Sequence, residues 1–256
     1  MRYEILGPLR LCNGHETAYI SARKIETLLA VLLSKPNQVI FTEQLITEIW
    51  GETPPRRARA ALHVYISQLR KILGADSDEP NPVVTKPNGY LLRLANEDLD
   101  LNVYRRLVHQ GRAHFTAGRF VDAANVLNAA LDLWHGPALE ELRSSPAIDR
   151  FASWLDQSRI ETTERFIEAN LMIDQHYDMI GLLYQLVDEH PLHENFYRQL
   201  MLALYRAGRR ADALEIYRVA RETMNRELGL EPCRPLTELQ RRILLGNDEF
   251  EMLQAN

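Results

Sequence analysis

The sequence predicts an α+β N-terminal winged helix-turn-helix with an antiparallel sheet and a wing hairpin, followed by an all-α tetratricopeptide-like domain. Three observations lead to this prediction. Within residues 1–94, strand-like segments both precede and follow three helical segments. After residue 101 the pattern is helical as far as residue 246, and a motif of small residues recurs there at an offset of 90 residues.

Length and composition restrict the class of protein. A chain of 256 residues with 46% apolar and 25% charged residues is long enough for two small folded domains and is not disordered in composition. The longest strictly apolar run, residues 28–33, is far too short to cross a bilayer, and the two cysteines have no paired spacing. We therefore expect a cytoplasmic protein with no membrane association and no cofactor.

The first domain is predicted from its turns and from its helical periodicity. Residues 3–6, 9–12 and 18–20 alternate like strands, and Gly7-Pro8 and Asn13-Gly14 are turn signals between them. A first helix is expected from an N-cap at Ser21 to Ser34, and a second from Thr42 to a C-terminal Gly51.

A third helix and a hairpin complete this domain. The helix is expected to begin within residues 53–56, because proline is favoured in a first helical turn, and to end at Gly74. Residues 82–86 and 90–94 flank Asn88-Gly89, a dipeptide suited to a tight hairpin because both residues tolerate positive φ. A sheet, three helices and a terminal hairpin are the element order of a winged helix.

The second domain is predicted to be a stack of helical hairpins. We place a winged-helix domain at residues 1–94, an acidic linker at 95–101, a tetratricopeptide-like domain at 102–246 and an acidic tail at 247–256. The motif Ala117-Gly118-Arg119 recurs as Ala207-Gly208-Arg209, and Tyr177 and Tyr184 belong to a degenerate copy about 34 residues before the last one. Trp154 and these tyrosines are expected to fill the packing between hairpins. An irregular helical bundle is the alternative.

Charge is distributed unevenly along the chain. The net charge of −5 divides into +3 for residues 1–94 and −8 for the remainder. Residues 53–75 contain four arginines and one lysine and no acidic residue. This segment is therefore a local electropositive element on an acidic protein, which is typical of a surface that binds nucleic acid.

The third helix separates its residues into two faces. Leu62, Ile66, Leu69 and Leu73 form a core seam at helical spacing. The other faces carry the candidate DNA-binding residues, with base contacts expected for His63, Val64, Ser67 and Gln68 and phosphate contacts for Arg56, Arg57 and Lys71. Arg59 and Arg70 lie on a flank of the helix, and Lys86 and Asn88 lie at the hairpin tip. A solvated helix face is the alternative, but such a face normally mixes acidic residues with basic ones.

Residues 46–51, 62–74 and 84–90 resemble OmpR-type winged helices. With a helical half that contains Arg221-Glu222-Thr223 and residues 227–232, the chain is similar to the Streptomyces antibiotic regulatory proteins and their bacterial transcriptional activator domain. The resemblance implies a pathway-specific activator of antibiotic biosynthesis that binds tandem direct repeats in promoters and recruits RNA polymerase holoenzyme. It also implies that Trp50 lies near the DNA backbone, that Lys86 is the wing contact, and that the protein is a dimer at least on DNA.

The sequence favours no enzymatic reading. No nucleophile elbow and no glycine-rich phosphate loop occur, and His190 and His193 lack the spacing of helical zinc ligands. The alternative function is a tetratricopeptide adaptor whose N-terminal domain binds protein rather than DNA. The arginine-rich third helix without acidic residues favours the activator.

Overall fold

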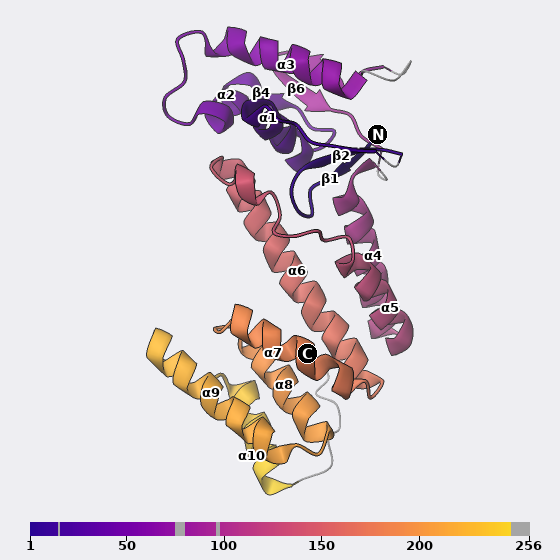
Figure 1. Cartoon of the computed structure of the whole chain (residues 1–256), viewed down its shortest axis with the longest axis vertical. Coiled ribbons are helices and arrows are strands. Elements are labelled where there is room, and N and C mark those ends of the chain that lie inside the picture. Colours follow the sequence, from indigo (N-terminus) through magenta and orange to yellow (C-terminus); the bar gives the residue numbers. More distant parts are fainter. Residues whose placement is uncertain (15, 75–79, 96–97, 247–256) are drawn as a thin grey trace. The chain divides into compact units, whose positions relative to one another are not determined.

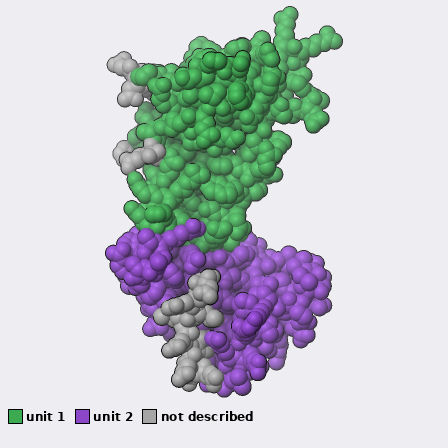
Figure 2. Space-filling model, turned by 180° about the vertical axis from the view of Figure 1, so that it is seen from behind, with its two compact units in different colours: residues 1–110, 128–162 green, residues 111–127, 163–256 purple. Residues whose placement is uncertain are grey.

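The computed structural model describes residues 1–14, 16–74, 80–95 and 98–246 (Figure 1). The chain forms two compact units, Met1–Gln110 with Asn128–Thr162, and Gly111–Leu127 with Thr163–Asn256 (Figure 2). The predicted acidic tail, residues 247–256, lies outside the described residues. Small antiparallel sheets at the N-terminal end and helices throughout the remainder agree with the predicted fold class.

The first unit opens with a small antiparallel sheet. Its strands are β1 (Arg2–Glu4), β2 (Arg10–Asn13) and β3 (Glu16–Ala18), in the order β1-β2-β3. All three predicted strands are present, each displaced by one or two residues. Tyr3 and Leu11 are partners in the β1–β2 register and both are buried, so this face of the sheet contributes to the core.

Three helices follow, namely α1 (Arg23–Ser34), α2 (Thr42–Trp50) and α3 (Ala58–Gly74). Ala22, not the predicted Ser21, occupies the N-cap of α1, and no side chain caps that end. Gly51 ends α2 with φ +65°, as predicted for a left-handed C-terminal residue. Helix α3 begins later than predicted, because Thr53 and Pro54 each precede a proline and this disfavours helical backbone at both.

A second sheet carries the wing hairpin. Its strands are β4 (Ile40–Phe41), β5 (Val83–Lys86) and β6 (Gly89–Leu92), in the order β4-β6-β5. Strand β4 was not predicted, because two residues are too few for a visible alternation. The hairpin turn consists of Pro87 and Asn88, with Asn88 at φ +61°, while Gly89 already pairs with Lys86. Gly89 is required for another reason, since a Cβ there would lie 2.4 Å from the Ile40 carbonyl oxygen.

The first unit does not end at the predicted boundary. Residues 96–97 of the predicted linker 95–101 lie outside the described residues, but Leu99, Asp100 and Leu101 are buried. Leu99 forms a parallel bridge with Tyr3. The Asp100 carboxylate accepts hydrogen bonds from the backbone amides of Ile5 and Leu6, at 2.8 and 3.0 Å. The segment is therefore integrated into the N-terminal core rather than acting as a linker.

Parts of the first helices of the second half also belong to the first unit. They are α4 (Asp100–Thr116), α5 (Phe120–Leu131) and α6 (Pro146–Met172), and the division between the units runs through all three. The Tyr104 hydroxyl lies 2.6 Å from the Thr162 hydroxyl, and the Tyr104 ring packs edge-on against Trp134. The amide of Leu139 donates to the Gly7 carbonyl at 2.9 Å. One hydrophobic core thus extends from Tyr3 to Leu155 in sequence.

Glu48 connects α2 to the start of α6. One of its carboxylate oxygens accepts hydrogen bonds from the Ser145 hydroxyl, at 2.6 Å, and from the Ala147 amide, at 2.9 Å. The Ser145 side chain is buried, and the Ala147 amide is one of those at a helix N-terminus that have no partner within their helix. A carboxylate at this end also interacts favourably with the helix dipole.

The second unit consists of helical hairpins. Its later helices are α7 (His176–Glu189), α8 (Glu194–Arg206), α9 (Arg210–Leu228) and α10 (Arg234–Leu245). The turns of the two predicted motif copies both contain a glycine with positive φ, Gly118 at +71° and Gly208 at +74°. The small residues that follow each turn, Ala123 and Ala213, are completely buried. These repeats are therefore helical hairpins packed through small residues, as predicted.

The aromatic residues of the helical half do not all pack as predicted. Tyr177 and Tyr184 are exposed at 66% and 41%, and α7 instead buries Met179, Ile180 and Leu183. Trp154 is also exposed, at 44%, with the Arg105 guanidinium 4.9 Å from its ring. Large aromatic rings at helical spacing mark a face of the helix, but the aliphatic residues one position away occupy the core.

Candidate nucleic-acid interface

Helix α3 has one buried and one exposed face, divided as the helical wheel predicts. Ala58, Leu62, Ile66, Leu69 and Leu73 are buried. The opposite face, which we call the groove face, is exposed and consists of Ala60, His63, Val64, Ser67, Gln68 and Lys71. Val64 is 53% exposed, so an apolar side chain is available on this face. Such a helix can present polar and apolar groups together to a partner.

The polar side chains at the centre of the groove face have no partner within the described part of the chain. Among the residues that the structure describes, Ser67, Gln68 and Lys71 form no side-chain hydrogen bond or ion pair. Arg56 and Arg57 are likewise exposed, in the turn that precedes α3, where the Arg57 carbonyl accepts the Ala61 amide at 3.0 Å. Basic residues therefore stand at the start of this face and near its end.

Arg59 differs from its neighbours because it is paired within the protein. Its guanidinium Nε donates to the Glu43 carboxylate at 2.9 Å, and both side chains are largely exposed. An exposed pair of this kind contributes little stability, but it cancels one positive charge. The acidic partner comes from α2, so the absence of acidic residues from residues 53–75 overstates the charge of the surface.

Arg70 holds the wing instead of facing outward. Its guanidinium donates from Nε and Nη2 to the Val83 carbonyl, at 3.1 and 3.0 Å, and from Nη2 to the Thr85 hydroxyl at 2.7 Å. Asn81 completes the connection, because its side chain donates to the Arg70 carbonyl and accepts from the Val83 amide. These contacts attach β5 to α3. Local sequence patterns cannot predict these contacts, since they join residues 13 positions apart across a loop.

His63 also has a partner on the wing. The Tyr90 hydroxyl lies 2.9 Å from His63 Nδ1, and the two rings meet edge-on with their centroids 6.3 Å apart. Arg59, His63 and Arg70 therefore occupy one flank of α3, and each is tied to another element. All three residues are predicted from the sequence to contact DNA, but their contacts with Glu43, Tyr90 and the wing could not be predicted from it.

Trp50 lies on the other flank of α3. Its ring stacks on Tyr65 with centroids 5.6 Å apart, and the Lys24 ammonium lies 5.1 Å from the Trp50 ring centroid. Tyr65 and His63 are two residues apart, which is about 200° around a helix. Trp50, the last residue of α2, is thus half-buried on the flank of α3 that faces away from the wing. The expected position near the DNA backbone remains a prediction.

The wing tip is exposed and anchored at its base. Lys86 and Asn88 are both exposed at the β5–β6 turn. The Asn88 carbonyl accepts the Thr42 amide at 2.9 Å and the Thr42 hydroxyl at 3.2 Å. The start of α2 therefore supports the turn, while Lys86 and Asn88 remain exposed.

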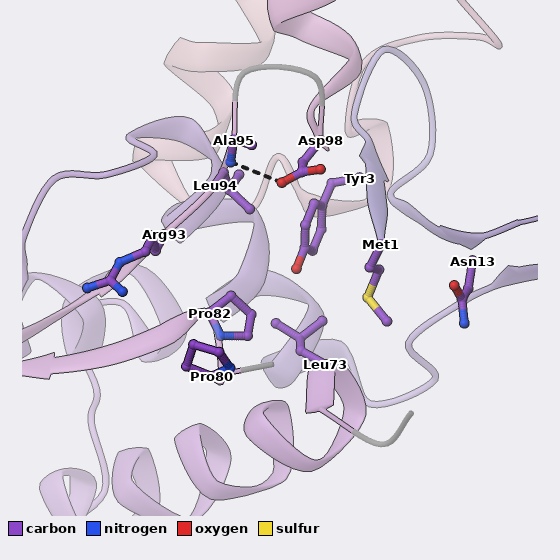
Figure 3. Close-up of a pocket in the computed structure, with 10 residues that line it drawn as sticks. All are labelled: Met1, Tyr3, Asn13, Leu73, Pro80, Pro82, Arg93, Leu94, Ala95 and Asp98. Carbon is purple, nitrogen blue, oxygen red and sulfur yellow. Dashed lines mark hydrogen bonds between the residues drawn. The ribbon is translucent and has the colours of Figure 1, made fainter. Parts of the chain in front are cut away.

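A hollow of about 340 Å³ lies at the C-terminal end of α3 (Figure 3). Its lining includes Tyr3, Leu73 and Asp98. Burial raises the pKa of the Tyr3 phenol to about 12, and Asp98 adds to this effect. Because Leu73 belongs to the buried seam of α3, this hollow lies on the side of the helix opposite the groove face and is no part of it.

The described residues contain neither a group of potential metal ligands nor a helix that could span a membrane. Within the described ranges, no three histidine, cysteine, aspartate or glutamate side chains are grouped so that they could hold a metal ion. His193, named above for its spacing, pairs with Glu164 at 2.6 Å. In the same ranges, no helix combines the length and the apolar character that a membrane crossing needs.

Two family models together match most of the chain. Residues 99–244 match the model described as "Bacterial transcriptional activator domain", and residues 18–92 match "Transcriptional regulatory protein, C terminal". The first match begins at residue 99, where the structure shows the chain entering the N-terminal core.

Known regulatory proteins are similar to nearly the whole of this chain. The regulatory protein DnrI of Streptomyces peucetius is 33% identical over 250 residues, which is 95% of this chain and 92% of DnrI. AfsR of Streptomyces griseus is 34% identical over 98% of this chain, which spans only 25% of AfsR. The solved structure of Mycobacterium tuberculosis EmbR in complex with a low affinity phosphopeptide matches with a TM-score of 0.92 at 33% identity, over 96% of this chain and 65% of that chain.

AfsR, DnrI and EmbR are all named as regulatory proteins. The order of the two matched models agrees with the order of a winged helix and a helical half in the structure. This chain therefore belongs to the Streptomyces antibiotic regulatory protein family, in which an OmpR-type winged helix precedes a bacterial transcriptional activator domain.

Proposed function

We propose that this protein is a sequence-specific DNA-binding transcriptional activator, acting in the cytoplasm on genes of a secondary-metabolite pathway. One observation carries the proposal. The groove face of α3 is exposed, has arginines at its start and a lysine near its end, and its central polar side chains have no partner among the described residues. A helix of this kind fits the major groove of B-DNA, whose base edges offer hydrogen-bond partners and thymine methyl groups.

The residues divide into three roles in this proposal. His63, Val64, Ser67 and Gln68 contact base edges, while Arg56, Arg57 and Lys71 contact phosphates and supply affinity without sequence information. Lys86 and Asn88 contact the adjacent backbone or minor groove from the wing. Arg59, Arg70 and Trp50 act indirectly, because each is engaged by Glu43, by the wing strand β5 or by Tyr65.

The helical half is proposed to recruit RNA polymerase holoenzyme. Two protomers would bind side by side on tandem direct repeats about one helical turn apart, as a dimer that forms at least on DNA. The chemistry of the protein requires no cofactor and no enzymatic step in this role.

The experiment that tests the proposal is a gel-shift titration of the purified full chain. The probes are promoter fragments from the neighbourhood of its own gene and a scrambled control, at several salt concentrations. Specific binding whose affinity falls steeply with salt is the expected result, because phosphate contacts release counterions. A folded protein that binds none of these duplexes would refute the proposal and favour the adaptor that binds protein.

Gln68 and Arg57 are expected to respond differently to substitution. Gln68→Ala should relax the preference at one base position by roughly 1–3 kcal/mol, because the amide reads a base edge. Arg57→Ala should weaken binding to every duplex and reduce the salt slope by about one unit, because a phosphate contact is lost. Competition titrations with single-position variants of the bound duplex measure both effects. Equal loss on all duplexes for Gln68→Ala would contradict its assigned role.

Arg70 and Lys71 form a matched pair of neighbouring cations. Arg70→Met should lower the free energy of unfolding by about 2 kcal/mol, because it removes charged hydrogen bonds to the wing, and leave the salt slope of DNA binding unchanged. Lys71→Met should leave the stability unchanged and reduce that slope by about one unit. Urea denaturation and salt titration distinguish the two. A reduced slope for Arg70→Met would make Arg70 a phosphate contact.

A further inference from the structure

His63, on the groove face, contacts Tyr90, which is buried and therefore inaccessible to DNA. Tyr90 is only 4% exposed, whereas His63 is exposed. The Tyr90 hydroxyl lies 2.9 Å from His63 Nδ1, so the second ring nitrogen, Nε2, is the one available to a ligand. The two nitrogens of the ring thus have different tasks.

The Tyr90 phenol is held from several sides. Strand β6 is the central strand of its sheet, and Tyr90 pairs with Ile40 on β4 and with Thr85 on β5. The Thr85 hydroxyl in turn accepts the Arg70 guanidinium, which comes from α3. The position of the phenol relative to α3 is therefore fixed by the same contacts that attach the wing.

The direction of the hydrogen bond determines which nitrogen of His63 carries the proton. Burial raises the pKa of the Tyr90 phenol, although the nearby Arg70 charge acts in the opposite direction, so the hydroxyl keeps its proton. A phenol is a stronger acid than the N–H group of neutral imidazole, so the hydroxyl donates and Nδ1 accepts. A neutral imidazole has one donor and one acceptor, and the hydrogen bond at one nitrogen fixes the state of the other. The proton of His63 then resides on Nε2.

We propose that Tyr90 is a positioning residue for DNA recognition, which fixes His63 as the Nε2–H tautomer so that it donates to a guanine at one base pair. Guanine is the base that presents two adjacent acceptors, N7 and O6, in the major groove. Tyr90 itself touches no base. The inference rests on the proposed function, since it requires α3 to lie in the major groove.

The tautomer can be tested without DNA. In full-length protein labelled with ¹⁵N-histidine, the His63 resonances are assigned by their absence from His63→Ala. The wild type should show a protonated Nε2 and an acceptor Nδ1, and Tyr90→Phe should show a mixture of tautomers. A protonated Nδ1 in the wild type, or an unchanged spectrum in Tyr90→Phe, would overturn the proposal.

The base preference is tested with a duplex that the wild type selects from a randomised pool. Tyr90→Phe should lower the discrimination at one guanine roughly 5- to 10-fold, the value of one hydrogen bond, and leave the preferences elsewhere unchanged. Replacing that guanine with 7-deazaguanine should weaken the wild type but not His63→Ala. Adding Tyr90→Phe to His63→Ala should cause no further loss, because the hydroxyl acts only through the imidazole.

Tyr65→Phe is the matched control, because it removes one phenol hydroxyl from the opposite flank of α3, where Tyr65 stacks on Trp50. It should leave discrimination unchanged. A uniform loss of affinity in Tyr90→Phe, with no change at any single base pair, would reduce Tyr90 to a structural residue and refute the proposal. If the wild type selects no sequence from the pool, the proposed function is refuted. The ¹⁵N-histidine spectrum then still tests the tautomer of His63, because that measurement needs no DNA.

Discussion

A fragment that ends at residue 101 is expected to lose most of the stability of the first unit, whereas a fragment that ends at Thr162 should retain it. The reason is the extent of the N-terminal core. Later residues contribute buried side chains to it, including Tyr104, Trp134, Leu139, Leu142, Ile148 and Leu155. Burying one large apolar side chain is worth about 1.5–3 kcal/mol, so the loss of these six is comparable with the roughly 5–15 kcal/mol that stabilises a whole domain.

Urea denaturation followed by far-UV circular dichroism measures this effect. The 1–162 fragment should unfold in a cooperative transition, and the 1–101 fragment should show a much lower midpoint or none. Equal midpoints would mean that α4 to α6 add nothing to the winged helix. The outcome also matters for assays of transcription, because a cut at residue 101 would impair DNA binding through stability alone. Removing residues 163–256 leaves the first unit intact and is the better test of the helical half.

The sequence was sufficient to predict the elements of the winged helix, but it was not sufficient to predict where its core ends. The buried seam of α3 follows from its helical periodicity, and the hairpin follows from its turn residues. Both signals lie within a few neighbouring positions of the sequence. The role of Asp100 depends on amides that lie 94 and 95 residues earlier in the chain. Because these partners are so distant in sequence, local patterns cannot reveal them, and the acidic segment that contains Asp100 is predicted to be a linker. The boundary was therefore displaced for a tertiary reason.

The candidate interface shows the same division between local and tertiary information. The helical wheel identified the exposed face correctly, because exposure follows the 3.6-residue period. It could not show that Arg59, His63 and Arg70 are engaged by Glu43, Tyr90 and the wing strand β5. Partner choice depends on how α2, α3 and β5 pack. The structure thus engages Arg59 and Arg70 within the protein, gives His63 a partner on the wing at one ring nitrogen, and leaves the centre of the groove face exposed.

Asp100 and Glu48 support the first unit in a similar way. Each is an acidic side chain that accepts hydrogen bonds from backbone amides of a segment distant in the sequence. Asp100 connects the start of α4 to the N-terminal sheet, and Glu48 connects α2 to the start of α6. Polar connections of this kind specify one arrangement of the packed elements, because an alternative packing would leave buried amides without partners.

Asp100→Ala is expected to lower the free energy of unfolding by on the order of 4 kcal/mol at neutral pH. The carboxylate accepts the amides of Ile5, Leu6 and Leu101, and Asp100 is only 1% exposed. Each buried amide left without an acceptor costs about 1–3 kcal/mol. Asp98→Ala is the control for loss of an acidic residue from the same segment, since Asp98 accepts only the Ala95 amide among the described residues. A loss below 1 kcal/mol for Asp100→Ala would show that water satisfies these amides.

The pH dependence of stability provides a second measurement on the same residue. Burial raises the pKa of Asp100 from 3.8 to about 6, although its three backbone hydrogen bonds favour the ionised form. Between these values the native chain holds the proton more tightly than the unfolded chain does. The contribution of Asp100 to stability is therefore greatest below about pH 4, falls by about 3 kcal/mol in total as the pH rises through 6, and becomes constant only at about pH 7.

Asp100→Asn removes this titration while keeping the size of the side chain. Urea denaturation of both proteins at intervals from pH 4 to pH 7 gives the difference in their free energies of unfolding, in which other titrating groups cancel. That difference should change by about 2 kcal/mol between pH 4 and pH 6, in the direction that favours the wild type at the lower pH. A difference that is constant over this interval would mean that Asp100 ionises at an ordinary pKa, and that its three hydrogen bonds to amides balance the effect of its burial.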